Sequence, residues 1–511
     1  MHSIGRREFC LGLGAMSAAT ALRGFAEPPR AQHPNVVFVL CDDLGWGDLD
    51  SYNHLSAIPT PNANRLAKEG MRWTDMHSGD AVCTPSRYGI LTGRYCWRGK
   101  LKHGVLNGYS PDLIEPGRMT VASMLKADGY YTAGVGKWHL GLGKPPRTNY
   151  GAPLDPGPTD LGFDYYFGIP ASLNMVPFLY FENNHVVEQA TTYTPGCKKD
   201  DRAPQIPEKV ADQPGFPPPG CKTPLGTRLQ AGAIAPHFVL DQVLPTITDK
   251  AVSIIDERAA KPNQPFFLYV ALPSPHNPWV PLPKYWGTSH AGKYGDYVVE
   301  TDAMLGKIMH ALDRNNLTKD TLIIFTSDNG ADWKLDMAAR YAHRANGPWR
   351  GEKADIWEGG HRVPFLARWP GHISAGSVCN ELGCLIDFMA TVAAIDGISL
   401  PRNAAEDSFN LLPALLEQSK KPIRESIINH SDDGMFAICQ GKWKLEEGLG
   451  SGGFSPPKRV EPGPGGPKGQ LYDLATDPYE KNNLYQRRPD IVNRLTAVLE
   501  KYERQGYTRP M

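Results

Sequence analysis

Four short apolar runs, separated by helical segments, limit this chain to a few folds. The runs cover residues 35–41, 130–136, 265–271 and 321–327. Their length and composition are typical of strands buried on both faces of a sheet. Helical segments are predicted at residues 120–128, 244–260 and 297–312. This alternation of strands and helices predicts an α/β fold with a mostly parallel sheet.

Each predicted strand ends in polar or charged side chains. In chain order they are Asp42 and Asp43, then Lys137 and His139, then His276, and finally Asp328 and Asn329. Taken singly, each also fits a helix cap, a loop or a core position. Because parallel sheets bind ligands beyond the carboxyl ends of their strands, we expect these side chains to converge there. The adjacent carboxylates Asp42 and Asp43 suit a hard cation such as Ca²⁺.

The segment Cys83-Thr84-Pro85-Ser86-Arg87 lies where a loop enters a predicted helix. A helix N-terminus presents unpaired N–H groups and the positive end of the helix dipole, so it favours negative charge. With Arg87 one turn further on, Cys83 could act on an anionic substrate. An isolated cysteine also fits a buried thiol that packs like a small hydrophobic side chain. Lys353 is a candidate second cation for the anion, or alternatively a solvated lysine.

The size and charge of the chain narrow the classes of function. Its 511 residues exceed what one compact core usually holds, so we expect a large domain over residues 33–400 and a smaller C-terminal subdomain over residues 401–511. Lys plus Arg and Asp plus Glu both number 54, which argues against a nucleic-acid partner. No apolar run approaches the length of about 20 residues that spans a membrane, so no stable membrane insertion is expected.

The first 26 residues have the pattern of an export signal. Arg6 and Arg7 precede a short apolar stretch that ends in small residues near Ala26, as in a twin-arginine signal. This predicts passage through the twin-arginine export machinery and a periplasmic or extracellular location in a bacterium. A cytosolic tail is the alternative reading.

Export would permit disulfide bonds among the nine cysteines. Cys197 with Cys221, and Cys379 with Cys384, are candidate pairs, although the sequence does not fix the pairing. Cys10 lies in the export signal. No cysteine spacing resembles a zinc site.

In chain order, these motifs resemble the signature of formylglycine-dependent sulfatases of the alkaline phosphatase superfamily. They are Asp42-Asp43-x-Gly-Trp-Gly-Asp, Cys83-x-Pro-x-Arg87, Gly136-Lys137-Trp138-His139, the strand ending at His276, Ser327-Asp328-Asn329-Gly330, and Lys353 before Glu358-Gly359-Gly360. Residues 168–172 and 287–290 resemble the branch of arylsulfatase A and N-acetylgalactosamine-6-sulfatase. The resemblance implies a large mixed, mostly parallel sheet sandwiched by helices, alkaline phosphatase-like, with a smaller C-terminal α+β subdomain.

The resemblance also implies a modified nucleophile and a metal ion. Cys83 would be oxidised by a formylglycine-maturation enzyme, and the hydrated aldehyde would attack sulfur. Asp42, Asp43, Asp328 and Asn329 would ligate Ca²⁺, an all-oxygen set that suits this ion. Asp328, beside both, could take the proton.

The remaining motif residues receive roles by the same resemblance. Arg87, Lys137 and Lys353 would hold sulfate oxygens. His276 would protonate the leaving alcohol, and His139 would contact the formylglycine hydrate and assist the return of the aldehyde. Ser172 aligns with a serine of the sulfate pocket.

The function expected from these motifs is hydrolysis of sulfate monoesters, on a sulfated carbohydrate or an aryl sulfate. One alternative is a phosphomonoester, phosphodiester or phosphonate hydrolase on the same scaffold. Another is a secreted carbohydrate-binding protein with an inactive site. His103, His343 and His361 are further candidates for substrate contact, and each also fits a surface or core position.

Overall fold

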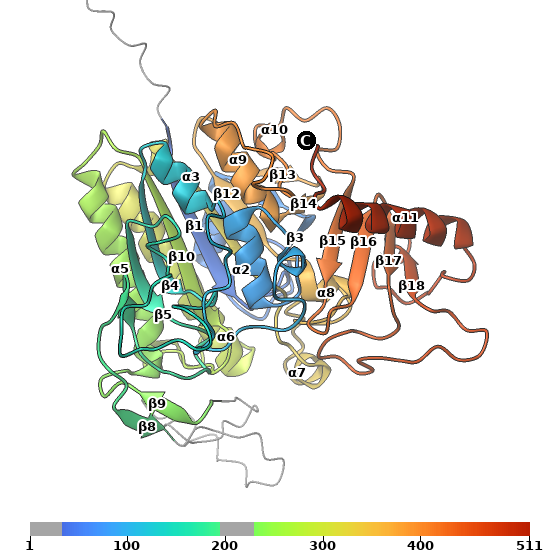
Figure 1. The fold of residues 1–511 in the computed structure, drawn as a ribbon, viewed down its shortest axis with the longest axis horizontal. Coiled ribbons are helices and arrows are strands. Elements are labelled where there is room, and N and C mark those ends of the chain that lie inside the picture. The colour runs from blue at the N-terminus through green and yellow to red at the C-terminus, as the bar shows by residue number, and fades with distance from the viewer. Residues whose placement is uncertain (1–32, 195–228, 511) are drawn as a thin grey trace, which may run out of the picture. The chain divides into compact units, whose positions relative to one another are not determined.

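A ten-stranded sheet runs through the computed structural model, which describes residues 33–194 and 229–510 (Figure 1). Across the sheet the strands are β13 (Ser377–Cys379), β2 (Met71–Trp73), β12 (Phe365–Arg368), β11 (Thr321–Ser327), β1 (Asn35–Asp42), β10 (Phe266–Pro275), β4 (Tyr131–Lys137), β5 (Tyr165–Ile169), β6 (Phe181–Glu182) and β7 (His185–Val186). The central strands β11, β1, β10, β4 and β5 are parallel to one another. β12, β6 and β7 pair antiparallel, so the predicted mixed, mostly parallel sheet is confirmed.

Helices cover both faces of this sheet. On one face lie α1 (Pro61–Glu69), α5 (Val243–Ala259) and α6 (Gly292–Arg314), and on the other lie α2 (Cys83–Thr92), α3 (Val121–Ala127) and α9 (Phe388–Ile395). β1 contributes to both cores: Val37 and Val39 join the α5–α6 side, while Val36 and Phe38 join the α2–α9 side. A strand buried on both faces needs apolar residues at every position, which explains its unbroken apolar run.

The predicted helix at residues 297–312 begins earlier in the structure, at Gly292. Its first turn is held from the preceding loop, because the Asp296 carboxylate accepts hydrogen bonds from the N–H groups of Gly287 and Ser289 at 2.9 and 3.0 Å. These partners lie outside the periodic apolar pattern, so periodicity alone did not mark this helix start.

The C-terminal part forms a second, antiparallel sheet. Its strands, in order, are β15 (Ser426–His430), β16 (Phe436–Gln440), β17 (Trp443–Glu446) and β18 (Gln470–Asp473), and α11 (Pro489–Gln505) packs against it. Its core includes Tyr95 and Trp97 from the first half of the chain. The smaller α+β unit is therefore observed, whereas its boundary near residue 400 stays a prediction, since residues 34–511 form one compact unit.

Short elements complete the described fold. They are β3 (Met76–His77), β14 (Gly383–Cys384), β8 (Thr192–Thr194), β9 (Gly232–Ile234), α7 (Leu335–Tyr341), α8 (Glu358–His361) and α10 (Leu412–Leu415). Among the described helices, none combines the length and the apolar composition that a membrane crossing requires.

The candidate disulfide between Cys379 and Cys384 is wrong. Both are free, buried thiols. They belong to different sheets: Cys379 in β13 lies opposite Trp73 of β2, and Cys384 in β14 lies opposite His77 of β3. The export signal with Cys10, and the candidate pair Cys197–Cys221, lie outside the described residues.

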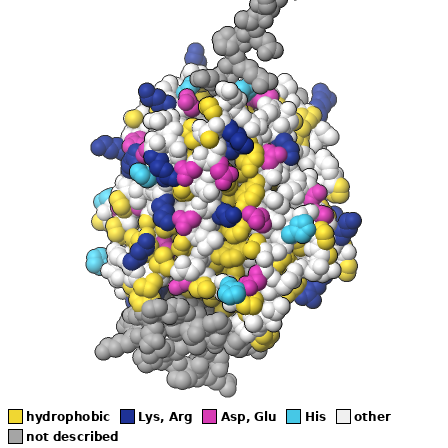
Figure 2. All heavy atoms as spheres, turned by 90° about the vertical axis from the view of Figure 1, so that its left-hand side faces the viewer, with side chains coloured by type: hydrophobic (Ala, Val, Ile, Leu, Met, Phe, Trp, Pro, Cys, Tyr) yellow, Lys and Arg dark blue, Asp and Glu magenta, His cyan; other side chains and the backbone are white. Residues whose placement is uncertain are grey.

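The surface over α5 mixes charges of both signs (Figure 2). Exposed ion pairs there join Lys250 to Glu182, Lys307 to Asp249 and Arg314 to Asp256. Each such pair contributes about 0–1 kcal/mol to stability. At these positions every cation is balanced by a carboxylate.

Candidate active site

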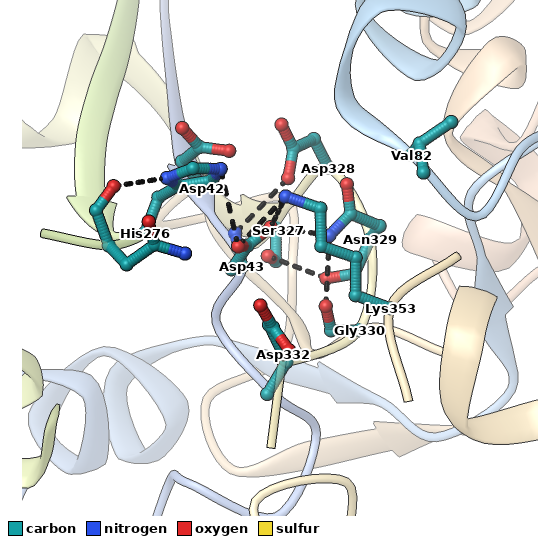
Figure 3. A network of polar contacts seen from close by, with 12 residues as sticks. Asp42, Asp43, Val82, His276, Ser327, Asp328, Asn329, Gly330, Asp332 and Lys353 are labelled. Carbon is teal, nitrogen blue, oxygen red and sulfur yellow. Dashed lines mark hydrogen bonds and ion pairs between the residues drawn. The ribbon is translucent and has the colours of Figure 1, made fainter. Parts of the chain in front are cut away.

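The carboxyl ends of β1, β4, β10 and β11 meet at one edge of the sheet, as predicted. Asp42 is the last residue of β1 and Lys137 the last of β4. His276 follows β10, and Asp328 and Asn329 follow β11. Because β1 pairs in parallel with both β10 and β11, and β10 with β4, these side chains come together. Figure 3 shows several of them turned toward a common centre.

Three carboxylates and three cations form the middle of this site. Lys137 Nζ lies 2.6 Å from Asp42 Oδ2, and Lys353 Nζ lies 2.7 Å from Asp43 Oδ1. Arg87 Nη2 lies 2.7 Å from Asp328 Oδ2 and 3.7 Å from Asp42 Oδ1. All six side chains are buried. Buried charges are tolerated only when they are paired, which these are.

The backbone at Asp43 explains how two consecutive carboxylates serve one site. Neighbouring residues of a strand point to opposite faces. Asp43 has a left-handed φ of 66°, its N–H donates to Asp328 Oδ1 at 3.2 Å, and its Oδ1 accepts a hydrogen bond from Asn329 Nδ2 at 2.7 Å. As a result, single ligand atoms of Asp42, Asp43 and His276 lie within 4.8 Å of one another.

Cys83 opens α2 and faces this cluster. Val82, the N-cap, is extended and supplies no side-chain cap, so the first N–H groups of the helix stay available around Cys83. The Cys83 thiol is within 4.8 Å of carboxylate oxygens of Asp42 and Asp328, and its residue is 2% exposed. Burial raises the pKa of the Cys83 thiol, and these two carboxylates add to that effect.

The three carboxylates differ in their affinity for a proton. Burial favours protonation of Asp42, but Lys137 and further cations outweigh it and hold its pKa below the usual value. Burial raises the pKa of Asp43 to about 6 against the pull of Lys353. Burial, with the Asp42 charge, also raises the pKa of Asp328 to about 6.

Two buried oxygens in the site lack a hydrogen-bond donor among the described residues, namely Asp42 Oδ1 and Asn329 Oδ1. An unsatisfied buried acceptor costs about 1–3 kcal/mol, so such atoms call for a partner. Together with Asp43 and Asp328 they form an all-oxygen set, which is the donor chemistry that Ca²⁺ prefers. The residues present therefore fit this ion.

The two site histidines each leave one ring nitrogen for chemistry. A carbonyl oxygen only accepts, so His139 Nε2 donates to Leu106 O at 2.8 Å, and His139 Nδ1 is buried without a partner among the described residues. His276 Nδ1 donates to Asn277 O at 2.6 Å, and its Nε2 lies 3.7 Å from Asp43 Oδ2. Burial, reinforced by Lys353, lowers the pKa of His276 to about 3, and burial lowers the pKa of His139 well below its usual value.

Ser172 also lies near this edge. It follows β5, whose Ile169 is in register with Lys137 of β4. The serine is buried, and its hydroxyl has no partner among the described residues. A buried, unpartnered hydroxyl at the end of a site strand is available to a ligand.

Of the three further histidines, two have structural surroundings. His343 Nε2 lies 2.8 Å from Asp48 Oδ1, and His361 lies buried with its Nδ1 2.9 Å from His77 Nδ1. His103 is exposed.

Sequence reasoning also missed Asp332, which lies beside the cluster in Figure 3 and 2.8 Å from Lys334. Its position just after Asp328-Asn329-Gly330 was the available signal.

Known proteins of one family resemble this chain. The model of the sulfatase family, described as "Sulfatase", matches residues 34–398. An N-acetylgalactosamine-6-O-sulfatase of Bacteroides thetaiotaomicron is 36% identical over 92% of this chain and 93% of its own length, and human arylsulfatase A is 35% identical over 89% and 84%. A solved structure described under the metabolism of multiple glycosaminoglycans by Bacteroides thetaiotaomicron superposes with a TM-score of 0.79, at 34% identity over 93% of this chain and 100% of that chain.

Proposed function

The chain belongs to the sulfatase family and is a sulfuric ester hydrolase. From that premise we propose that it removes sulfate from carbohydrates with a formylglycine nucleophile made from Cys83 and with Ca²⁺ held by Asp42, Asp43, Asp328 and Asn329. The hydrate of formylglycine supplies an oxygen nucleophile for sulfur. Bound at the four oxygen ligands, Ca²⁺ would stabilise the anionic nucleophile and orient the sulfate.

One observation carries this proposal: Cys83 begins a buried helix next to three buried cations and to two oxygens, of Asp42 and Asn329, that lack a hydrogen-bond donor among the described residues. A tetrahedral anion placed at Cys83 meets Arg87, Lys137 and Lys353, whose charges are fixed before the reaction by ion pairs to the three aspartates. Cations positioned in advance stabilise charge that develops in the transition state without a cost of reorganisation. We assign these three side chains to the sulfate oxygens, with Ser172 as a further donor.

The two histidines divide the proton transfers. His276 Nε2 faces the centre of the site while Nδ1 is held by Asn277, so we assign Nε2 to the leaving sugar oxygen. It delivers a proton only from the imidazolium form, which the negative charge of a bound sulfate ester favours over the neutral ring of the free site. His139 Nδ1 carries a lone pair and faces no other acceptor or donor of the described chain, so it takes a proton from the nucleophile's second hydroxyl group. Asp328 Oδ1, already an acceptor, is positioned to receive the other proton.

Sulfated carbohydrates are the proposed substrate class because the similar curated proteins are named for N-acetylgalactosamine 6-sulfate and the similar solved structure for glycosaminoglycan metabolism. The N-terminal arginine pair supports export through the twin-arginine machinery to a periplasmic or extracellular location. A maturation enzyme acting on Cys83 completes the set of proposed partners. The family match over residues 34–398 supports a catalytic domain that ends near residue 400.

The direct test is the mass of the tryptic peptide of residues 73–87, from protein produced together with a maturation enzyme. A sulfur-free, aldehyde-bearing residue 83, appearing together with aryl sulfate hydrolysis, is the expected result. An unmodified thiol in a host that matures another sulfatase would overturn the formylglycine mechanism. Turnover of matched aryl sulfate and aryl phosphate esters then separates the proposal from a phosphatase.

A further inference from the structure

The turn between β15 and β16, residues 431–435, brings the C-terminal sheet to the active site. β15 runs beside the loop that leads into Cys83, where the Ala81 N–H donates to the His430 carbonyl oxygen at 2.9 Å. His430 also pairs with Asp80 of the same loop, with 3.2 Å between Nδ1 and Oδ1. The chain that leaves β15 is therefore anchored next to the nucleophile before it turns.

Asp432 is fixed in this turn beside Lys353. Its N–H donates to the Ala354 carbonyl oxygen at 3.0 Å, and its carbonyl oxygen accepts from the Gly104 N–H at 2.7 Å. The Ala354 N–H in turn donates to Ala81 at 2.8 Å. Ala354 thus links the turn to the nucleophile loop, directly after the lysine assigned to sulfate.

The Asp432 carboxylate forms no hydrogen bond or ion pair with the described residues that would explain its place in the fold. It is half-buried and accepts no hydrogen bond from any described residue. Burial raises the pKa of its carboxyl group, and the Lys353 ammonium is the strongest charge opposing that rise, with the exposed Lys458 and His103 contributing less. The backbone hydrogen bond from Asp432 to Ala354 therefore keeps this aspartate close to Lys353 of the site.

Its neighbour Asp433 differs in each of these respects. The Asp433 carboxylate is held by Arg459 at 2.6 Å and by the Ser431 hydroxyl at 2.8 Å, and the residue is exposed. The two consecutive aspartates thus differ. Asp433 is held by local partners, whereas the Asp432 carboxylate has no hydrogen-bond partner among the described residues and lies next to the site.

A carboxylate beside an anion-binding lysine repels the substrate's sulfate. Its presence there is favourable only if another interaction with the substrate compensates for that repulsion. Lys353 is already neutralised by Asp43 at 2.7 Å, so its charge does not require Asp432. A carboxylate accepts hydrogen bonds from hydroxyl groups, which a sugar offers on carbons next to the sulfated one. It also repels a second sulfate placed there, because both are negative.

Given the proposed function, on which this inference rests, we propose that the Asp432 carboxylate accepts a hydrogen bond from the sugar hydroxyl nearest the scissile sulfate. This contact makes the protein selective for sugars carrying a single sulfate. Sites built to hydrogen-bond a hydroxyl discriminate strongly against substrates that lack it. The turn at residues 431–435 is then a specificity element that the C-terminal sheet contributes to a site otherwise built by the large sheet.

The test measures kcat/KM of the matured full-length protein on a panel of hexoses and N-acetylhexosamines with one sulfate at position 3, 4 or 6. The best of these is compared with its counterpart carrying a second sulfate on the nearest hydroxyl, and with 4-nitrophenyl sulfate. We expect the wild type to prefer the monosulfated sugar by about tenfold or more. Asp432→Asn should lower kcat/KM on it by roughly tenfold to a hundredfold, mainly through KM, and narrow the preference.

Asp433→Asn is the matched control, since it removes the same charge one residue away and should leave the sugar preference unchanged. Activity on 4-nitrophenyl sulfate, which offers no hydroxyl to Asp432, should be unchanged in Asp433→Asn and should not fall in Asp432→Asn. Equal effects of the two substitutions, or no effect of Asp432→Asn on sugars, would overturn the inference. So would hydrolysis of the aryl sulfate with failure of every sugar sulfate, whereas failure of both substrate types would overturn the proposed function itself.

Discussion

Two buried groups of charged side chains in this protein differ in how their charges are paired: each active-site carboxylate has a cation of its own, whereas a single ammonium serves three carboxylates in the second group. In the active site, cations pair with Asp42, Asp43 and Asp328, yet Asp42 Oδ1 and Asn329 Oδ1 keep unfilled acceptor positions. The second group, which we call the Lys444 network, consists of Lys444, Glu358, Glu446 and Glu480. At its centre Lys444 Nζ lies 2.7 Å from Glu480, 3.1 Å from Glu358 and 3.5 Å from Glu446.

The difference teaches how to recognise a metal site among buried charges. His77, Glu358 and His361 also come close enough together to hold an ion. Lys444 Nζ, however, lies 3.2 Å from His361 Nε2, so an ammonium attached to the chain already lies among them. Proximity of histidine and carboxylate is thus a weak criterion. Oxygens without a hydrogen-bond donor are a weak criterion too, since Glu358 Oε1 and both carboxylate oxygens of Glu446 lack one as well among the described residues. What marks the Lys444 network is the ammonium of the chain at its centre, 3.1 Å from Glu358 Oε1 and 3.5 Å from Glu446 Oε1.

The largest expected effect is the loss of turnover on substitution of Cys83, which should affect the active site and not the Lys444 network. Cys83→Ala should lower kcat/KM by about 10⁴-fold or more, because the nucleophile is lost, and should leave the melting temperature nearly unchanged. Cys96→Ala, the same substitution at another buried thiol, is the control and should retain turnover. Residual turnover in Cys83→Ala within tenfold of the wild type would contradict the assignment of the active site.

Breaking the Lys444 network should produce the opposite pattern. Lys444→Met removes the ammonium that pairs with Glu480 and leaves Glu358 with Arg362 as its cation. It should lower the free energy of unfolding by about 3–5 kcal/mol, measured by denaturant titration. The fraction that stays folded should keep its kcat. Lys442→Met, at a half-exposed lysine of the same hairpin that pairs with Asp473, should cost less than about 1 kcal/mol. A lower kcat in Lys444→Met without a lower free energy of unfolding would contradict the assignment of the Lys444 network to stability rather than catalysis.

Removing Ca²⁺ with a chelator should affect only the active site. We expect loss of turnover and a fall in stability of about 2.7 kcal/mol relative to protein at a free Ca²⁺ concentration of about 100 Kd, both restored by added Ca²⁺. Lys444→Met should show the same Ca²⁺-dependent increment in stability, since its network binds no diffusible cation. Full activity and stability in excess chelator would show that the unfilled oxygens do not bind the ion.

A smaller effect is expected at Glu300, a buried carboxylate that has neither a metal site nor an ion pair in the described structure. Its Oε2 accepts from the Leu282 N–H at 3.0 Å, its Oε1 has no partner, and burial raises its pKa to about 7 from 4.5. The folded state therefore holds the proton more tightly, and stability falls as pH rises from about 4.5 to about 7. Glu300→Gln should remove this fall and gain about 3 kcal/mol at pH 8 but little at pH 4.

Urea titrations at both pH values measure that gain. Glu257→Gln, at an exposed position of α5, is the control and should show no pH-dependent difference. An equal effect of Glu300→Gln at pH 4 and pH 8 would indicate that burial does not shift the titration of Glu300.

The sequence predicted the active site well wherever its residues are tied to a strand end. Asp42, Lys137, His276 and Asp328 each end or follow an apolar run, and parallel pairing alone brings such positions together. The helix start at Cys83 was also predicted, because the change from loop to helix is encoded locally. In these cases the local sequence pattern marks the end of a strand or the start of a helix, and the parallel sheet places that same position at the active site.

Other features depend on contacts between distant segments and left no local signal. Lys353 lies in a loop, where the sequence pattern left it open as a second cation or a solvated lysine, and the resemblance to a family motif favoured the first. β15 and the turn after it reach Cys83 through the hydrogen bond between Ala81 and His430, which no periodicity encodes. The left-handed backbone at Asp43 is unusual for a residue other than glycine, so the shared orientation of both carboxylates was not predictable.

The burial of α2 has a consequence for the order of events in the life of this protein. Every residue of the helix is buried, and Cys83 itself is 2% exposed, so an enzyme has no access to it once the chain has folded. If Cys83 is converted to formylglycine as proposed, modification and folding therefore compete in time, and a chain that folds first is excluded from activation. The specific activity of a preparation should accordingly reflect the ratio of two rates, and slowing the folding should yield more active enzyme from the same amount of chain.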